Sequence, residues 1–172
     1  MHQEKWKKDS EYCALIEDLL QYEEVQTLVN YTHHYTTNRL DHSLSVSYRS
    51  YLVAKKLDLD TRAVARAGLL HDLFYYDWRT TKFDEGTHAF VHPHIACQNA
   101  EKLTELSDLE RDIIIKHMWL ATVAFPKYKE SYIVSLVDKY CAITEVLSPV
   151  KAKIASWFNG GKERVRVTSK TQ

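Results

Sequence analysis

The sequence has few of the residues that break helices or form turns. It contains four glycines and three prolines in 172 residues. Sheet proteins of this size usually use more of both residues in their turns, so the scarcity favours an all-α fold. Hydrophobic residues make up 45% of the chain and charged residues 27%, which is ordinary for a soluble globular protein. The length suits a single domain with its own core.

The sequence also lacks net charge, paired cysteines and long apolar runs. Its 23 basic and 23 acidic residues cancel, which argues against a broad surface for nucleic acid or membrane. The cysteines Cys13, Cys97 and Cys141 are odd in number and far apart, which indicates a reducing compartment. No run approaches the ~20 apolar residues of a membrane span, and the polar N-terminus has no signal-peptide pattern. We therefore expect a cytoplasmic protein.

Apolar residues recur with helical spacing along most of the chain. We predict helices over residues 10–31, 41–57, 61–75, 92–106, from 107 to an end near His117, 130–147 and 150–158, with Pro126 marking a break. Asp9 or Ser10, Asp60 and Ser107 are candidate N-caps, and Ser107 with Glu110 has the pattern of a capping box. Pro93 suits the first turn of the helix that we begin at His92. These helices predict one bundle of about six to seven helices.

The expected organisation has three parts. Residues 1–30 form an N-terminal helix that packs on the bundle, and residues 31–158 form the main domain. Residues 159–172 form a basic tail that we expect to be flexible.

The segment GLLHDLFYYDW, at 68–78, places His71 and Asp72 directly behind two leucines. Burying such groups without partners costs several kcal/mol, so the pair needs partners. Other residues of the same two types lie on predicted helices beside apolar neighbours, namely His42, His92, His117 and Asp138. Imidazole with carboxylate suits Fe, Mn, Zn, Co or Ni. Six donors exceed the needs of one catalytic ion, whereas two ions ~3.5–4 Å apart use all six if Asp72 bridges them.

Four segments in this order resemble the motifs of the HD superfamily of metal-dependent phosphohydrolases. They are RLDHS at 39–43, GLLHD at 68–72, HPHIA at 92–96 and VDKYCA at 137–142. The resemblance implies an all-α single-domain bundle with metal ligands on inner helix faces. It assigns the first ion to His42, His71, Asp72 and Asp138, and the second to His92, His117 and the bridging Asp72. Members with this fuller set include cyclic-dinucleotide phosphodiesterases and symmetrical dinucleoside tetraphosphatases.

The resemblance also implies an activity. We expect hydrolysis of a phosphoester or phosphoanhydride, with a nucleotide as the expected substrate, by a metal-activated hydroxide. The catalytic residues are then His71 and Asp72, with two divalent ions. Iron or manganese is preferred, and Zn, Co, Ni or Mg are alternatives. Phosphate contacts need fixed cations, and our candidates for binding the substrate are Arg39, Arg79 and Lys82.

The sequence departs from its relatives at three places. Tyr75 stands where many relatives have a lysine three residues after the aspartate, and Ala96-Cys97 replaces the usual Gly-Ala. There is no GYP motif, so a cyclic-di-GMP substrate is not supported. The aromatic residues Tyr75, Tyr76 and Trp78 either stack on a nucleobase or pack the loop 76–87 onto the bundle.

Two other functions stay open at this level. The ligand order also resembles that of HD-type di-iron oxygenases such as inositol oxygenase. A non-catalytic nucleotide-binding regulatory domain is the third hypothesis. Exposed aromatic residues would permit a homodimer without requiring one. The other histidines are predicted as loop, surface or supporting residues, with His33 or His34 near the mouth of the site.

Overall fold

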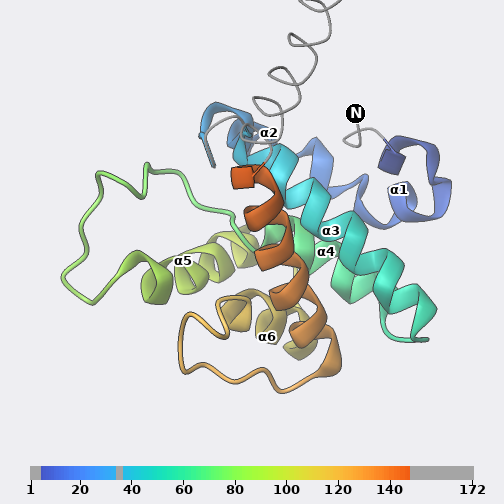
Figure 1. The fold of residues 1–172 in the computed structure, drawn as a ribbon. Helices are drawn as coiled ribbons and strands as arrows, with labels where there is room; N and C mark the ends of the chain where they lie inside the picture. Colours follow the sequence, from blue (N-terminus) through green and yellow to red (C-terminus); the bar gives the residue numbers. More distant parts are fainter. Residues whose placement is uncertain (1–4, 34–36, 148–172) are drawn as a thin grey trace, which may run out of the picture.

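The computed structural model describes residues 5–33 and 37–147 (Figure 1). Within these ranges every element is a helix, and the β pairing amounts to two isolated bridges. The elements are η1 (Lys5–Lys8), α1 (Ser10–Ile16), η2 (Leu19–Gln21), α2 (Glu23–Gln26), η3 (Thr27–Asn30), α3 (Arg39–Lys56), α4 (Thr61–Leu70), α5 (His88–Leu103), α6 (Asp108–Lys116) and a helix whose described residues are 129–147. The all-α prediction is confirmed. The predicted helix 150–158 and the basic tail 159–172 lie outside the described residues.

The core of the bundle is the packing of α3 on α4, with α6 against the other side of α4 and α5 against α6. At Gly68 the backbones of α3 and α4 come so close that an added Cβ would lie 2.9 Å from the Cα of Ser47. The helix 129–147, orange in Figure 1, contacts α6 through a hydrogen bond of 2.6 Å from Ser131 to Asp112. It also reaches α3, so it closes the bundle over the other helices.

The prediction of one continuous helix over residues 10–31 is wrong. The structure divides this segment into α1, η2, α2 and η3, with extended backbone at Tyr22. Glu23 and Glu24 follow the break, and acidic residues stabilise the N-terminus of a new helix. The bends let successive short helices bury their apolar residues against the bundle, which a straight helix would not do. The Tyr12 hydroxyl anchors the segment by donating to Ser47, at 2.7 Å.

Two predicted helix boundaries are also wrong. α4 ends at Leu70 rather than near Tyr75, because the chain turns at His71 while its apolar pattern continues into Leu73 and Phe74. α5 begins at His88, so Pro93 lies inside the helix instead of in its first turn. Pro93 cannot donate a backbone hydrogen bond there.

Because α4 ends at Leu70, His71 and Asp72 sit at a helix end, where a turn can aim them away from the helix axis.

The predicted caps of three helices are confirmed. Asp9 accepts from the amide of Tyr12, and Asp60 from the amide of Ala63. Ser107 forms the complete capping box with Glu110. None of the helices in the described residues combines the length and apolar character needed to span a bilayer. The division into parts 1–30, 31–158 and 159–172 stays a prediction.

Candidate metal centre

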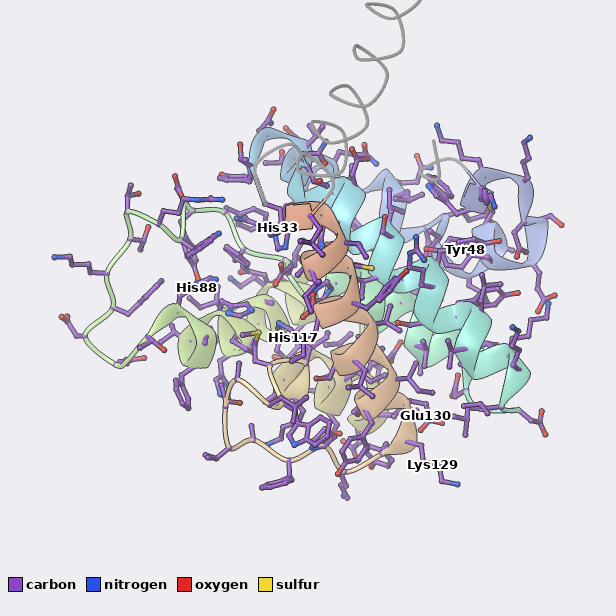
Figure 2. The ribbon with its side chains drawn as sticks, in the orientation of Figure 1. His33, Tyr48, His88, His117, Lys129 and Glu130 are labelled. Carbon is purple, nitrogen blue, oxygen red and sulfur yellow. The ribbon has the colours of Figure 1, made fainter. Side chains whose placement is uncertain are left out.

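The fold brings the six predicted donors into one buried cluster. His42 comes from α3, His71 and Asp72 from the end of α4, and His92 from α5. His117 follows α6, and Asp138 lies on the helix 129–147. All six residues are at least nine-tenths buried. In Figure 2, His33, His88 and His117 lie on one side of the helix 129–147.

Asp72 stands between two sets of ring nitrogens. Its Oδ1 lies 3.3 Å from Nε2 of His92 and 3.7 Å from Nε2 of His117. Its Oδ2 faces the other way, 3.9 Å from Nε2 of His71. Asp138 completes the second set, with Oδ1 3.0 Å from Nε2 of His42 and 3.6 Å from Nε2 of His71. The two oxygens of one carboxylate thus face two separate groups of donors.

Backbone carbonyls orient three of the imidazole rings. Nδ1 of His71 lies 2.8 Å from the carbonyl of Gly68, and Nδ1 of His92 lies 2.8 Å from that of His88. Nδ1 of His117 lies 2.7 Å from the carbonyl of Ile114. A carbonyl oxygen only accepts, so each Nδ1 carries a proton, and in its neutral form each ring presents the lone pair of Nε2 to the cluster. A metal-ligating histidine is commonly held in this way.

The Nε2 lone pairs that point into the buried cluster favour a bound cation. Nε2 of His92 and Nε2 of His117 lie 2.8 Å apart, so their lone pairs repel each other when both rings are neutral. Nε2 of His71 is buried and makes no hydrogen bond within the described residues. A buried polar atom without a partner is costly. Divalent metal ions bind both imidazole nitrogens and carboxylate oxygens, so these residues fit the metal that the sequence predicts.

His42 is oriented differently, by a carboxylate that the sequence analysis missed. Its Nδ1 lies 3.0 Å from Oε1 of Glu145, while its Nε2 faces Asp138. Burial alone would lower the pKa of His42, but these two carboxylates outweigh it and raise the pKa to about 10. The sequence signal was present, because Glu145 lies seven residues after Asp138 and so shares its helix face.

Electrostatics divide the cluster into charged and neutral members. Burial would raise the pKa of Asp72, but His71 and His92 outweigh it and hold that pKa well below its ordinary value. Asp138 is likewise held low by His42 and His71 against the effect of burial. Burial and two neighbouring imidazoles lower the pKa of His117 to about 3. The carboxylates are therefore ionised and His117 is neutral at physiological pH, the forms that bind a metal.

A cavity of about 410 Å³ opens onto one side of the cluster. Asp72, His92, His117 and Asp138 contribute to its lining, whereas His42 and His71 lie behind it. The remaining lining residues are mostly apolar and include Phe74, Trp78, Met118, Ala121 and Ala142. The cavity therefore joins four of the six donors to a mostly apolar wall.

Comparison with known proteins now places the chain in a family. The profile of the HD domain matches residues 39–143, which contain all six donors. The chain belongs to the HD-domain family. A ribonuclease Y of Protochlamydia amoebophila (strain UWE25) is 43% identical over 67 residues, 39% of this chain. The chain spans about 12% of the length of that relative. No solved structure shows significant similarity to the chain.

The cations predicted to bind substrate lie away from the cavity of this HD domain. Arg39 is fully buried and donates to the carbonyls of Phe74, at 2.5 Å, and Tyr76, at 3.2 Å. Nη2 of Arg79 donates to the carbonyl of His33 at 2.7 Å, and Lys82 lines a separate surface hollow. None of the three lines the cavity. Their role in substrate binding stays a prediction, and the contacts of Arg39 hold the turn after Asp72.

Lys139, which follows Asp138, lines the cavity. Its Nζ donates to the carbonyl of His117 at 2.9 Å and to Oγ of Ser135 at 3.0 Å. Ser135 also donates to the carbonyl of His117, at 2.7 Å. The two side chains together cap the C-terminus of α6, where a positive charge is favourable. They fix the backbone from which the ring of His117 projects.

The aromatic residues after Asp72 pack the loop onto α5. Trp78 stacks on His88 with ring centroids 5.7 Å apart, and His88 stacks on His92 at 4.2 Å. The hydroxyl of Tyr76 lies 3.2 Å from Nδ1 of His88. Burial and the nearby His92 lower the pKa of His88 to about 4, so this ring is neutral. Of the two interpretations of these aromatics, loop packing accounts for the contacts.

Proposed function

We propose that this HD domain is a metal-dependent phosphohydrolase that cleaves a phosphoester or phosphoanhydride bond, with a nucleotide as its expected substrate. The observation that carries the proposal is Asp72, whose two oxygens face two separate groups of ring nitrogens. Two divalent ions, with Fe or Mn preferred, would activate a water molecule and neutralise the charge that develops on the phosphoryl group.

The residues of the chain would divide the work as follows. His42, His71 and Asp138 would hold one ion, and His92 and His117 the other, with Asp72 shared. The apolar wall of the cavity would take the organic part of the substrate and exclude water around the phosphoryl group. The relative named ribonuclease Y supports this class of reaction, since a ribonuclease cleaves phosphoester bonds.

The two alternatives are distinguished by their requirements. A di-iron oxygenase would need iron and would consume dioxygen, whereas a hydrolase would turn over anaerobically with manganese. A regulatory domain would bind a nucleotide and release no phosphate under any metal. The complete donor set favours an enzyme over the regulatory domain, since a degenerate site would have lost a donor.

The experiment combines metal counting with turnover. The protein is reconstituted anaerobically with Fe²⁺ or Mn²⁺, and metal content is measured by plasma mass spectrometry for the wild type, Asp72→Ala and His92→Ala. His94→Ala is the matched control, because His94 is exposed on the same helix. We expect about two ions per chain in the wild type and control, fewer in His92→Ala, and fewest in Asp72→Ala.

The same samples are then screened anaerobically for phosphate release from nucleotides. We expect turnover with Mn²⁺ in the wild type and in His94→Ala, and none in Asp72→Ala. One ion per chain, unchanged in His92→Ala, would contradict the dinuclear site. Oxygen consumption without phosphate release would contradict the hydrolase and support the oxygenase.

A further inference from the structure

His33 lies at the metal centre although it precedes the residues that match the HD domain. It lines the cavity and is 9% exposed. Its Nδ1 is 3.6 Å from Oδ2 of Asp72, and its ring stacks on that of His42 with centroids 3.7 Å apart. A histidine in this position is a candidate either for a further metal ligand or for a contact to the substrate.

The backbone of His33 is held from two sides. Its amide donates to the carbonyl of Thr37 at 2.8 Å, just before the start of α3. Its carbonyl accepts from Nη2 of Arg79 at 2.7 Å. The guanidinium of Arg79 lies 4.6 Å from the ring centroid of Trp78, so the loop after Asp72 supports it. The ring of His33 is therefore placed by fixed contacts.

Stacking argues against ligation of one ion by both His33 and His42. Ring nitrogens of these two residues and an oxygen of Asp72 lie close enough together to share an ion. An imidazole, however, donates its lone pair in the plane of the ring. The two rings are 3.7 Å apart with an angle of 23° between their planes. One ion cannot lie in two nearly parallel planes so far apart, and His42 already faces Asp138.

We propose that His33 contacts the substrate, and that a ring N–H of His33 donates a hydrogen bond to a phosphoryl oxygen in the cavity. Phosphoryl oxygens are charged acceptors, and hydrogen bonds to them are strong. Arg79 is then a positioning residue for His33, and not itself a phosphate ligand. This inference rests on the proposed function, because it requires a phosphoryl group beside Asp72.

The test measures manganese content and the binding of inorganic phosphate separately. The full chain is reconstituted with Mn²⁺, and phosphate affinity is measured by calorimetry at constant pH for the wild type, His33→Ala, His33→Asn, Arg79→Met, Arg79→Lys and Lys56→Met. Lys56→Met is the matched control, because Lys56 is an exposed cation at the C-terminal end of α3 and does not line the cavity.

We expect every variant to keep the manganese content of the wild type. His33→Ala should weaken phosphate binding by about tenfold or more, and His33→Asn, which keeps an N–H donor, should restore part of the loss. Arg79→Met should weaken binding by a smaller factor, Arg79→Lys should recover it, and Lys56→Met should have no effect.

Loss of manganese in His33→Ala would make His33 a ligand and overturn the proposal. Unchanged phosphate affinity in His33→Ala would overturn it as well. If the manganese-loaded wild type binds no phosphate, the proposed function fails together with this inference. The wild-type measurement thus separates the two failures.

Discussion

Single residues in the centre are oriented by local carbonyls more than by other side chains. His71, His92 and His117 each hydrogen-bond to a carbonyl three or four residues earlier in the chain. Their orientation therefore depends on the helix turn on which they sit. His42 is the exception, because Glu145 lies 103 residues away in sequence. The group of donors that contains His42 is therefore more sensitive to a distant substitution than the group of His92 and His117.

This difference predicts the effect of replacing Glu145. Glu145→Ala should lower affinity for the first metal ion about 10–100-fold, since a partner that orients a ligating imidazole contributes that much. Glu145→Gln keeps an acceptor oxygen and should lose less. Titration with Co²⁺ against a chromophoric chelator measures both variants. Equal affinities in wild type and Glu145→Ala would show that His42 needs no such partner.

At the scale of helices, the two N-caps Ser107 and Thr87 form a matched pair. Ser107 accepts from the amide of Glu110, whereas Thr87 makes no capping hydrogen bond with its side chain. Ser107→Ala should therefore lower the free energy of unfolding by about 1 kcal/mol. Thr87→Ala should change it by only a few tenths. Urea denaturation compares the two variants, and equal losses would contradict this reading of the caps.

Helices whose ends carry local signals could be predicted from sequence. The capping box of Ser107 and the cap at Asp60 fixed the starts of α6 and α4. The end of α4 could not be predicted, because Leu73 and Phe74 continue the apolar pattern and are buried, although the chain has left the helix. Tertiary packing also divides residues 10–31 at Tyr22, where no glycine or proline marks the break.

The candidate site was predictable where motifs carry it. The order of RLDHS, GLLHD, HPHIA and VDKYCA identified five of the six donors that the fold brings together, and His117 was found by its apolar neighbours on a predicted helix. His33 and Lys139 could not be assigned, because their roles depend on contacts between distant segments. Glu145 shares a helix face with Asp138, but its contact with His42 also joins distant segments. Arg39 was predicted for phosphate because of its charge, and its burial among backbone carbonyls appears only in three dimensions.

At the scale of the whole molecule, Arg66 joins the N-terminal segment to the bundle. It donates to Asp18 at 2.6 Å and to the carbonyl of Leu15 at 3.1 Å, and lies 3.8 Å from Glu110 of α6. The hydrogen bond from Arg66 lowers the pKa of Asp18, and partial burial opposes it. The N-terminal helices therefore depend on an ion pair as well as on apolar contacts.

This ion pair predicts a dependence of stability on pH. The pKa of Asp18 is lower in the folded than in the unfolded state, so its contribution is present above about pH 4 and is lost as the pH falls further. Asp18→Asn should thus be less stable than the wild type at pH 7, and the difference should shrink towards pH 3. Thermal denaturation across this range measures it.

A control for this prediction is Glu11→Gln, which removes the exposed ion pair with Lys55. Lys55 is 48% exposed whereas Arg66 is 5% exposed, and exposed pairs contribute little, so this variant should lose less stability at pH 7 than Asp18→Asn. A loss in Asp18→Asn that stays constant from pH 7 to pH 3 would mean that the charge of Asp18 does not matter.

Metal removal gives a further prediction for the whole molecule. Ligands that bind only the folded chain stabilise it by mass action, about 2.7 kcal/mol at a free concentration of 100 times Kd. A chelator should therefore lower the melting temperature of the wild type and leave that of Asp72→Ala unchanged. The same shift in both proteins would place the stabilising ion elsewhere.

The separation of 96 positions between His42 and Asp138 also bears on how the protein is made. A ribosome delivers the chain from its N-terminus, so α3 and α4 can pack while Asp138 has not yet been synthesised. Until then, Nε2 of His42 and Nε2 of His71 face an incomplete set of donors. A nascent chain would hold an ion weakly at most, and firm loading of metal must wait until the helix 129–147 has left the exit tunnel. Metal loading would then follow the packing of this helix against α3.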